Sequence, residues 1–492
     1  MVRGIRFLPL LFAAATTLVA QNPAGIDRRL RFAVRLADQP DSALSLVDRM
    51  REYHIPGLSF AVIDNYRVVF AKGYGVAEFG GTKPVDTTTL FLAGSISKPV
   101  FASGLLRIIE ERRLSLDADV NEYLKSWKLP ESRFTEREKV TLRRLLSHSA
   151  GLTVWGFPGY ATTASIPTVP QVLDGAAPAN TAAVRNDTTP GARWLYSGGG
   201  ITIAQLLVTD VAGEPFPALM RRLVLQPASM SRSTYENPLP AARHSEAASG
   251  HERLDTPVPG RFHVYPEMAA AGLWTTASDL ARWAIALSRS YRGEPGGVLS
   301  TTMAKQMVSK QIQQKPPYGN GYWGLGVSVA GDGDSISFSH GGRDEGFVAT
   351  MVMWPNRGRG FVILMNGVQG GLMAEIQRAF AEEYGFGAPA RPTKNLVKLP
   401  SATLAGFGGR YSTVVNRDTV RIDISVSRDE KMLIARDLVS GRTQPLAPVG
   451  GDAFVNLENA TELTFERSGG AGSPVRAMAT GPAQNRRVFT KQ

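Results

Sequence analysis

Cysteine is absent from this chain of 492 residues, and long apolar runs are missing from its mature part. Without thiols, the fold can use neither disulfides nor cysteine-bound zinc. Beyond the first 20 residues, no stretch reaches the roughly 18 uninterrupted apolar residues that a membrane-spanning helix needs. With 43% hydrophobic and 20% charged residues, the composition predicts a soluble globular protein and excludes a disordered chain.

Clustered positive charge is also missing, although the formal net charge is +12. Arginine and lysine occur as isolated residues or pairs with acidic residues between them, which argues against a nucleic-acid partner. Histidine is scarce, with six residues, no His-Glu-x-x-His motif and no ligand spacing on one helix. We therefore expect neither a metal nor another cofactor. The sequence does not indicate an oligomeric state.

The first 20 residues have the pattern of an export signal. Arg3 and Arg6 precede the apolar segment Phe7–Val19, which is too short to span a bilayer, and small residues end at Ala20. We expect cleavage after Ala20. This pattern predicts a periplasmic or secreted protein, without a transmembrane segment in the mature chain.

The order of predicted strands and helices indicates the fold class. Two strands come first, at Leu58–Ile63 and Arg67–Val76, joined by a turn at Asp64–Asn65. The clearest helices then follow at Val100–Arg113, Leu142–Ser147, Ile201–Val211 and Ala277–Ser290. Strands return at Trp323–Val329, Ser335–Ser339, Gly346–Trp354 and Gly360–Asn366, before a helix at Met373–Tyr384. Because both ends supply strands, we expect an α/β fold: an antiparallel sheet flanked by helices, plus a helical subdomain.

Composition shifts divide the chain into segments. We predict a signal peptide over 1–20, a hydrolase domain over 21–390, a linker over 391–400 and a small all-β domain over 401–492. The last segment consists of short alternating runs, which favour a barrel or a sandwich. The strands that we predict there are 409–411, Val420–Val426, Met432–Ala435, Ala453–Leu457, Glu462–Glu466 and Arg487–Thr490.

A Ser-x-x-Lys motif stands at Ser95 and Lys98, where a predicted apolar helix begins. Residues three apart on a helix share a face, so the lysine amine is expected near the serine hydroxyl. Nucleophilic catalysis needs a serine activated in this way. The alternative is a helix-capping serine beside a solvent-facing lysine.

Two further motifs carry polar groups beside glycines. Tyr196 and Gly198 lie in a Gly-rich turn before a helix, where a tyrosine can accept a proton if a nearby cation lowers its pKa. His340 stands between two predicted strands, where an imidazole that titrates near neutral pH can donate a proton. Gly341 and Gly342 follow it and open the strand edge, whose backbone N–H groups can polarise a carbonyl. Each motif alone is also compatible with an ordinary turn.

Competing motifs are absent or misplaced. No Gly-x-Ser-x-Gly occurs, which argues against an α/β-hydrolase nucleophile elbow. The Gly-x-Gly-x-x-Gly at 319–324 precedes a predicted strand, whereas a dinucleotide site must follow one. Aromatic side chains that could line an acyl pocket are Trp155, Tyr318, Tyr322 and Trp323.

Taken in order, the three motifs resemble those of the serine β-lactamase and penicillin-binding-protein superfamily: Ser-x-x-Lys, Tyr-x-Asn, then Lys/His-x-Gly. The resemblance is strongest to the class C-like branch, with its family VIII carboxylesterases and D-aminopeptidases. It covers about residues 30–390, and further similar stretches are 145–152, 272–280 and 323–326. The C-terminal segment is similar to the lipocalin-like domains often appended to this branch.

The resemblance implies roles for particular residues. Ser95 would be the acylated nucleophile, Lys98 its activating base and Tyr196 the group that carries protons to the leaving group. His340 would stand where a lysine is common. The oxyanion hole would use the backbone N–H groups of Ser95 and Arg343, beside Gly341 and Gly342. Gly198 departs from the pattern, because an asparagine usually holds the substrate amide there.

These implications lead to an expected function. We expect an exported serine hydrolase acting through an acyl-enzyme on small esters, amides or D-amino-acid peptides, so that its partner is a small molecule or peptide. The departure at Gly198 ranks an esterase or peptidase above a β-lactamase or D,D-carboxypeptidase. The alternative from another class is a slowly turning-over, penicillin-recognising sensor.

Overall fold

The computed structural model describes residues 23–41, 43–253, 255–315, 320–386, 391–415, 418–470, 472–481 and 486–492. The predicted signal peptide lies outside these residues. No helix among the described residues is long and apolar enough to cross a membrane.

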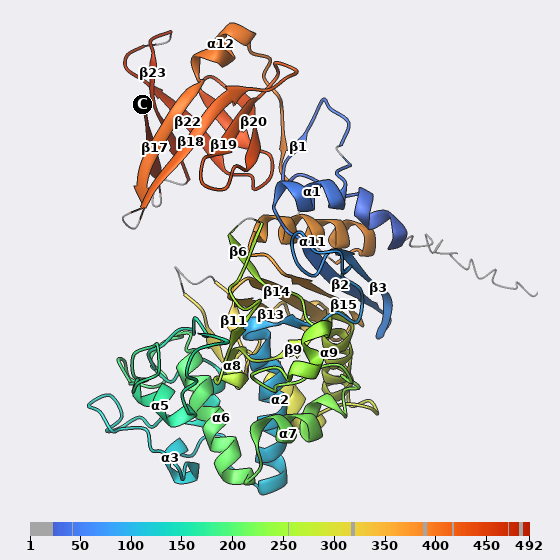
Figure 1. The fold of residues 1–492 in the computed structure, drawn as a ribbon, viewed down its shortest axis with the longest axis vertical. Coiled ribbons are helices and arrows are strands. Elements are labelled where there is room, and N and C mark those ends of the chain that lie inside the picture. The colour runs from blue at the N-terminus through green and yellow to red at the C-terminus, as the bar shows by residue number, and fades with distance from the viewer. Residues whose placement is uncertain are drawn as a thin grey trace, which may run out of the picture.

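The described chain is stacked in layers beneath a C-terminal barrel (Figure 1). An eight-stranded antiparallel sheet has the order β10-β11-β12-β13-β14-β15-β2-β3. In Figure 1, α1 and α11 lie between this sheet and the barrel, whereas α2, α9 and the helical subdomain lie on the opposite side. The early and late strands meet where β15 pairs with β2, with Ile363 opposite Phe60. The predicted α/β fold with one antiparallel sheet is therefore confirmed.

The elements of the layered part have the following bounds: η1 Pro23–Arg28, β1 Arg35–Leu36, α1 Leu46–Glu52, β2 Gly57–Asp64, β3 Arg67–Gly75, β4 Phe91–Leu92, η2 Gly94–Ile96, α2 Ser97–Arg112, α3 Val120–Tyr123, α4 Leu142–Leu146, β5 Tyr160–Ala161, α5 Val169–Asp174, α6 Gly198–Ala212, α7 Phe216–Met220, η3 Arg221–Leu225, η4 Ala241–Glu246, β6 His251–Arg253, β7 Thr256–Pro257, β8 His263–Val264, α8 Met268–Ala271, β9 Trp274–Thr275, α9 Ala277–Arg292, α10 Thr301–Met307, β10 Ile312–Gln313, β11 Tyr322–Trp323, β12 Ser328–Ala330, η5 Gly333–Ser335, β13 Ser337–Asp344, β14 Phe347–Trp354, β15 Arg359–Met365, α11 Gly370–Tyr384 and β16 Thr393–Lys394. The single strand expected at Trp323–Val329 is wrong, because β11 and β12 are separate antiparallel strands. Gly326, at φ +86°, lies in the turn between them, in a conformation that glycine adopts without steric cost.

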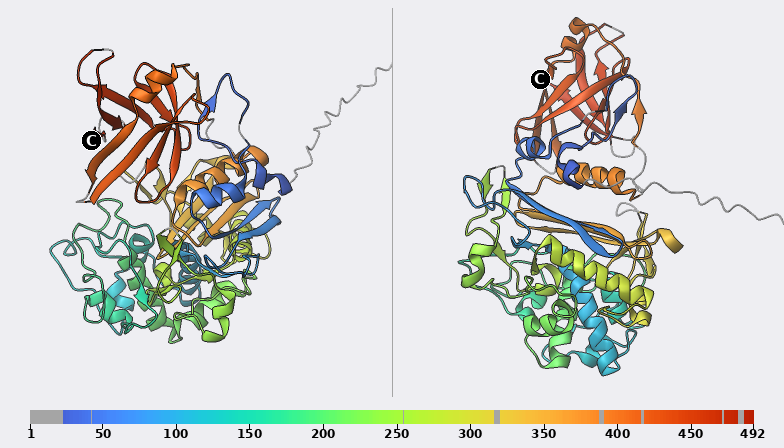
Figure 2. Two further views of the ribbon diagram at one scale, coloured as in Figure 1. Left: turned by 45° about the horizontal axis from the view of Figure 1, so that its top comes forward. Right: turned by 90° about the vertical axis from the view of Figure 1, so that its right-hand side faces the viewer.

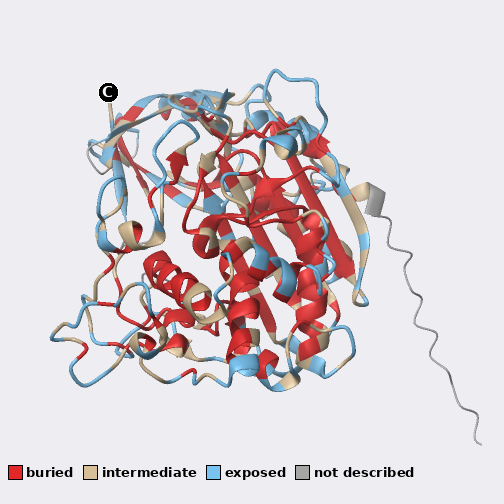
Figure 3. Ribbon diagram, turned by 60° about the horizontal axis from the view of Figure 1, so that its bottom comes forward, coloured by how far each residue is buried: buried red, intermediate tan, exposed pale blue. Residues whose placement is uncertain are grey.

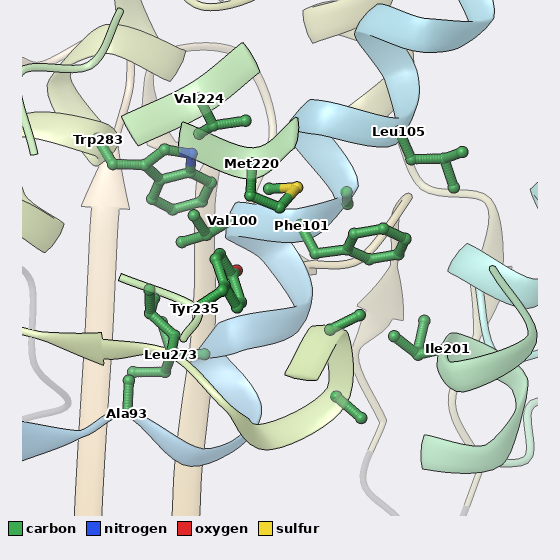
Figure 4. Close-up of a cluster of buried hydrophobic side chains, with 14 of the residues drawn as sticks. Ala93, Val100, Phe101, Leu105, Ile201, Met220, Val224, Tyr235, Leu273 and Trp283 are labelled. Carbon is green, nitrogen blue, oxygen red and sulfur yellow. The ribbon is translucent and has the colours of Figure 1, made fainter. Parts of the chain in front are cut away.

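Helix α2 runs through the centre of the largest apolar core. Its residues are buried on nearly all sides, and Phe101 and Leu105 have no exposed surface. Figure 4 shows Val100 and Phe101 on α2 among side chains from other elements, including Met220 and Trp283. Figure 3 shows the same concentration of buried residues in the interior helices and sheet. A helix enclosed in this way holds the residues at its first turn in fixed positions.

The C-terminal segment is a closed antiparallel barrel of eight strands. Its elements are α12 Ser401–Gly406, β17 Gly409–Val415, β18 Asp418–Val426, β19 Leu433–Asp437, β20 Thr443–Gly450, β21 Ala453–Asn456, β22 Glu462–Arg467, β23 Val475–Thr480 and β24 Arg487–Lys491. The sequence did not predict β20 or β23. Strand β20 contains Pro445 and Pro448, and β23 contains Ala477 and Ala479. Proline and alanine are depleted in strands, so the local sequence of neither segment predicts a strand.

Several kinds of contact join the barrel to the layered part, and Figure 2 shows both parts in two further views. Strand β1 pairs in parallel with β16, inside the segment predicted as a linker. Val34 and Leu36 pack with Val455 and Leu457 of the barrel in a small apolar cluster. The limits of the predicted domains stay predictions.

Candidate functional site

The turn that carries Ser95 is pressed against strand β13. Gly94 has φ +53°, and a Cβ atom there would lie 2.4 Å from the backbone nitrogen of Arg343. A Cβ atom at Gly342 would lie 1.9 Å from the carbonyl oxygen of Ala93. Only glycine fits at either position. The two backbones therefore touch, and Ser95, in η2 directly before α2, lies beside the edge formed by Gly341, Gly342 and Arg343.

Lys98 faces Ser95 from the first turn of α2. Its Nζ atom donates to Ser95 Oγ at 2.9 Å and to the carbonyl oxygen of Ala270 at 2.8 Å. The lysine is 2% exposed, so the alternative of a solvent-facing lysine does not hold. Burial lowers the pKa of Lys98 to about 7, opposed by the nearby Asp344 carboxylate. A substantial neutral fraction of this amine is therefore present at neutral pH.

Tyr196 completes a close group with these two residues. It lines the same cavity as Ser95 and Lys98, and Lys98 Nζ lies 5.1 Å from the centre of its ring. Ser197 caps helix α6 by accepting the N–H of Gly200 at 2.9 Å, which fixes the turn. Burial raises the pKa of Tyr196 well above its usual range. The expectation that a cation lowers this pKa is therefore wrong, and Tyr196 keeps its proton.

His340 projects from β13 into the same space. Its ring lies 6.3 Å from the Tyr196 ring and 5.3 Å from the Trp323 ring, measured between centroids. Burial lowers the pKa of His340 to about 3, with a further contribution from Lys98. The expectation that this imidazole titrates near neutral pH is therefore wrong: it is neutral there, because almost no water reaches it.

Gly198 lies where a side chain would fit only tightly. A Cβ atom would stand 3.0 Å from Phe157 Cε2 and 3.1 Å from the carbonyl oxygen of Trp155. The Gly198 N–H donates to that same carbonyl at 3.0 Å, so the segment around Trp155 is tied to the start of α6. An asparagine here would require this segment to move.

Ser95, Lys98, Tyr196 and His340 surround one cavity of about 670 Å³, whereas Gly198 is not among its lining residues. It is lined by Ser95, Lys98, Trp155, Gly156, Phe157, Pro158, Trp194, Tyr196, Glu252, Ala270, Ala271, Trp323, His340, Gly341, Gly342, Arg343, Asp344, Glu345, Val348 and Ala349. Trp155 and Trp323 line it as expected, whereas Tyr322 is not among the lining residues and Tyr318 lies outside the described residues. Trp155 is 68% exposed, which is unusual for so large an apolar side chain.

Sequence reasoning missed some residues around the site. His148 stacks on Tyr196, with 4.1 Å between ring centroids, and its Nδ1 atom accepts the Ser197 N–H at 3.2 Å. The stretch 145–152 carried a family resemblance that could have pointed to it. Asp344 is also buried against the site, yet nothing in the sequence distinguishes it from a turn residue.

No group of three or more potential metal-ligating side chains occurs among the described residues. The polar atoms nearest the candidate nucleophile are instead an amine, a phenol, an imidazole and backbone amides. This set supports serine-centred chemistry: a hydroxyl within reach of a base and beside N–H groups that can bind an oxyanion.

The fold and the site together define a class of α/β proteins with a Ser-x-x-Lys helix packed against an antiparallel sheet. The family model described as Beta-lactamase matches residues 44–386, and the chain belongs to this family.

Curated relatives include an esterase. Protein flp from Staphylococcus aureus (strain MRSA252) is 22% identical over 324 residues, which are 64% of this chain and 60% of that protein. Esterase EstB from Burkholderia gladioli is 26% identical over 194 residues, 37% of this chain and 47% of that protein. The match with protein flp thus covers about 60% of that relative's length.

Solved structures show the same fold. The octameric penicillin-binding protein homologue from Pyrococcus abyssi has a TM-score of 0.61 and 22% identity, covering 91% of this chain and 97% of that one. A β-lactamase/D-alanine carboxypeptidase from Yersinia pestis has a TM-score of 0.53 and 18% identity, and the match covers 69% of this chain and 97% of that one. These solved structures, each under 25% identical, therefore share the fold of this chain.

Proposed function

We propose that this chain is an exported serine hydrolase that forms an acyl-enzyme at Ser95. Its substrates are small esters, amides or D-amino-acid peptides, with esters preferred over β-lactams. The observation that carries the proposal is the buried Lys98 amine, 2.9 Å from the Ser95 hydroxyl. The esterase and carboxypeptidase relatives support the same chemistry.

The proposed reaction has two halves. Ser95 Oγ attacks the substrate carbonyl carbon while its proton passes to neutral Lys98, and the N–H groups of Ser95 and Arg343 hold the oxyanion. The tetrahedral intermediate collapses, and the leaving alcohol or amine takes a proton delivered through Tyr196. Water then attacks the acyl group with Lys98 as base, which releases the acid and restores Ser95.

The pH dependence follows from Lys98. Because the base must be neutral and burial lowers the pKa of Lys98 to about 7, kcat/KM should fall about tenfold per unit below pH 7 and level off above it. His340 stays neutral throughout this pH range, so its titration should not change kcat/KM there. A profile measured from pH 5 to 9 that is flat across pH 7 would contradict Lys98 as the base.

Gly198 supports the preference for esters. Without a side chain that can hold a substrate amide, about 1 to 3 kcal/mol of transition-state binding is missing for amide-bearing substrates. We expect kcat/KM for p-nitrophenyl butyrate to exceed that for nitrocefin by at least about tenfold. The reverse order would favour a β-lactamase.

The central experiment combines labelling with turnover. A fluorophosphonate probe should modify Ser95, located by peptide mass, and Ser95→Ala should lose both labelling and p-nitrophenyl butyrate hydrolysis while keeping its fold. Ser115→Ala, which changes an exposed serine, is the matched control. A single burst without steady turnover would instead favour the slow penicillin-recognising sensor. Recovery of exported protein beginning at Gln21 would support the signal peptide.

A further inference from the structure

His148 contacts the segment that carries Tyr196 at three successive residues, although it is not among the residues that line the cavity. Its backbone carbonyl oxygen accepts the N–H of Leu195 at 2.7 Å, and its Nδ1 atom accepts the N–H of Ser197 at 3.2 Å. Between these two hydrogen bonds, its ring lies 4.1 Å from the Tyr196 ring, measured between centroids, with 39° between the ring planes. His148 therefore contacts Tyr196 itself and both of its neighbours in the chain.

The backbone of His148 has a left-handed conformation, with φ +53°. Residues other than glycine seldom adopt this conformation, and it persists only where the surrounding contacts hold the residue in place. His148 follows α4, and its N–H donates to the carbonyl oxygen of Leu145 in that helix at 3.2 Å. The residue is 2% exposed. The imidazole is therefore held both from α4 and from the segment around Tyr196.

The protonation of the His148 ring follows from its burial and its contacts. Burial lowers the pKa of His148 well below its usual range, with further contributions from Lys98 and His340, so the ring is neutral at neutral pH. Because Nδ1 accepts the Ser197 N–H, the one proton of the neutral ring is on Nε2. Nε2 has no hydrogen-bond partner among the described residues. A ring in this state has no free lone pair, so His148 cannot serve as a second base beside Lys98.

We propose that His148 is a positioning residue for the departure of the leaving group, and that it acts by holding Tyr196 through the Ser197 hydrogen bond and the ring contact. The inference rests on the proposed function. Lys98 takes the Ser95 proton during attack, and Tyr196 gives a proton to the departing oxygen and regains one from the Lys98 ammonium. Because proton transfer needs hydrogen-bond reach, a displaced Tyr196 ring would slow this step.

Two esters of the same acid separate this role from a general effect on folding. p-Nitrophenyl butyrate releases a phenolate that is stable as an anion, whereas benzyl butyrate releases an alkoxide that must be protonated as it leaves. The value of kcat/KM for each ester reports the steps up to departure of the leaving group. A misfolded fraction lowers both values equally. The readout is therefore the ratio of kcat/KM for benzyl butyrate to that for p-nitrophenyl butyrate.

Two variants of His148 should differ in this ratio. His148→Leu removes both the Nδ1 acceptor and the planar ring, and it should lower kcat/KM about thirtyfold for benzyl butyrate but less than about threefold for p-nitrophenyl butyrate. His148→Asn keeps a side-chain acceptor close to the backbone, and asparagine tolerates the left-handed conformation. This variant should therefore keep the ratio within about threefold of the wild-type value.

His244 provides the matched control. Its ring also packs against an aromatic ring, that of Phe262, at 5.3 Å between centroids, and its Nε2 atom lies 2.9 Å from the carbonyl oxygen of Leu239. It is not among the cavity-lining residues. His244→Leu should leave the ratio unchanged.

A double variant tests whether His148 acts through Tyr196. Tyr196→Phe removes the proton donor and should itself lower the ratio, and adding His148→Leu should not lower it further. An additive loss in the double variant, an equal loss on both esters in His148→Leu, or a ratio in His148→Asn as low as in His148→Leu would overturn the proposal. A ratio lowered in Tyr196→Phe but not in His148→Leu would overturn this inference alone. An unchanged ratio in Tyr196→Phe would overturn the role of Tyr196 in the proposed function and this inference with it.

Discussion

Two groups of buried polar side chains in this molecule differ in how fully they are paired. One group joins the barrel to the layered part and consists of Arg49, Tyr53, Glu375, Arg442 and Glu458; we call it the interdomain ion cluster. The other lies beside the cavity and consists of Lys98, His340 and Asp344; we call it the pocket cluster. Apart from Arg442, whose side chain is 18% exposed, all of these residues are at most 5% exposed, so the differences between the clusters reflect their partners rather than their exposure.

The interdomain ion cluster is balanced and hydrogen-bonded. Arg49 donates to Glu375 at 2.5 and 2.8 Å and to Glu458 at 2.6 Å. Tyr53 donates to Glu375 at 2.8 Å and accepts from Arg442 at 2.8 Å, while Arg442 also pairs with Glu458. Within the cluster, two guanidinium groups thus meet two carboxylates, and Arg49 also pairs with the half-exposed Glu52 outside it. Such a cluster fixes the barrel in place and leaves no group free to react.

The pocket cluster lacks this pairing. No residue among those described forms an ion pair with Lys98 or Asp344, and burial moves the pKa values of Lys98 and His340 down and that of Asp344 up. Perturbed, unpaired groups in a cavity are typical of functional sites. Of these two clusters of buried ionisable side chains, only the one without ion-pair partners lies at the candidate site.

The largest expected effect comes from removing the amine of the pocket cluster. Lys98→Met keeps the volume and removes the base, so kcat/KM for p-nitrophenyl butyrate should fall about 10³-fold. The melting temperature should not fall, because an unpaired buried amine adds no stabilising ion pair. Lys72→Met, at a half-exposed lysine, is the control. Activity retained within about tenfold would mean that Lys98 is not the base.

A smaller effect is expected from unbalancing the interdomain ion cluster. Glu458→Gln removes one of the three carboxylates paired with Arg49 and the one paired with Arg442 among the described residues, which should lower the free energy of unfolding of the docked barrel by about 3 kcal/mol. Urea denaturation followed by tryptophan fluorescence and circular dichroism measures this change. Glu462→Gln breaks an exposed pair with Lys394 on the same barrel and should cost less than about 1 kcal/mol. Equal costs would show that pairing in the interdomain cluster adds nothing beyond a surface contact.

The smallest expected effect has the opposite sign. Burial, opposed by the charge of Lys98, raises the pKa of Asp344 well above its usual range. The native state therefore loses stability as pH rises above about 4, where the unfolded carboxyl ionises. Asp344→Asn should then raise the free energy of unfolding by about 1 kcal/mol at pH 8 and by less at pH 4. A variant that is less stable than the wild type at pH 8 would contradict the unpaired state of Asp344.

Much of the candidate site could be predicted from short-range chemistry. The spacing of Ser95 and Lys98 on one helical face placed hydroxyl and amine together, and the structure brings them to 2.9 Å. The glycines at 341 and 342 indicated an open strand edge. The main sheet was predictable because alternating apolar residues at both ends of the segment had to share one antiparallel layer. The all-β class of the C-terminal domain was predicted, but β20 and β23 were missed because proline and alanine lower the β-propensity of those segments.

What the sequence determined by itself is therefore local: a Ser-x-x-Lys helix start, a tyrosine before a capped helix, a glycine-rich strand edge and a segment of short strands. Tertiary structure decided the protonation states of these residues. Burial alone makes Lys98 a base near pH 7 and His340 a neutral acceptor, and no residue type encodes that burial. The tertiary structure also brought together Arg49 and Glu458, which are 409 residues apart in the sequence, and left Asp344 unpaired. Pairing between distant residues depends on how whole layers pack, which sequence spacing does not carry.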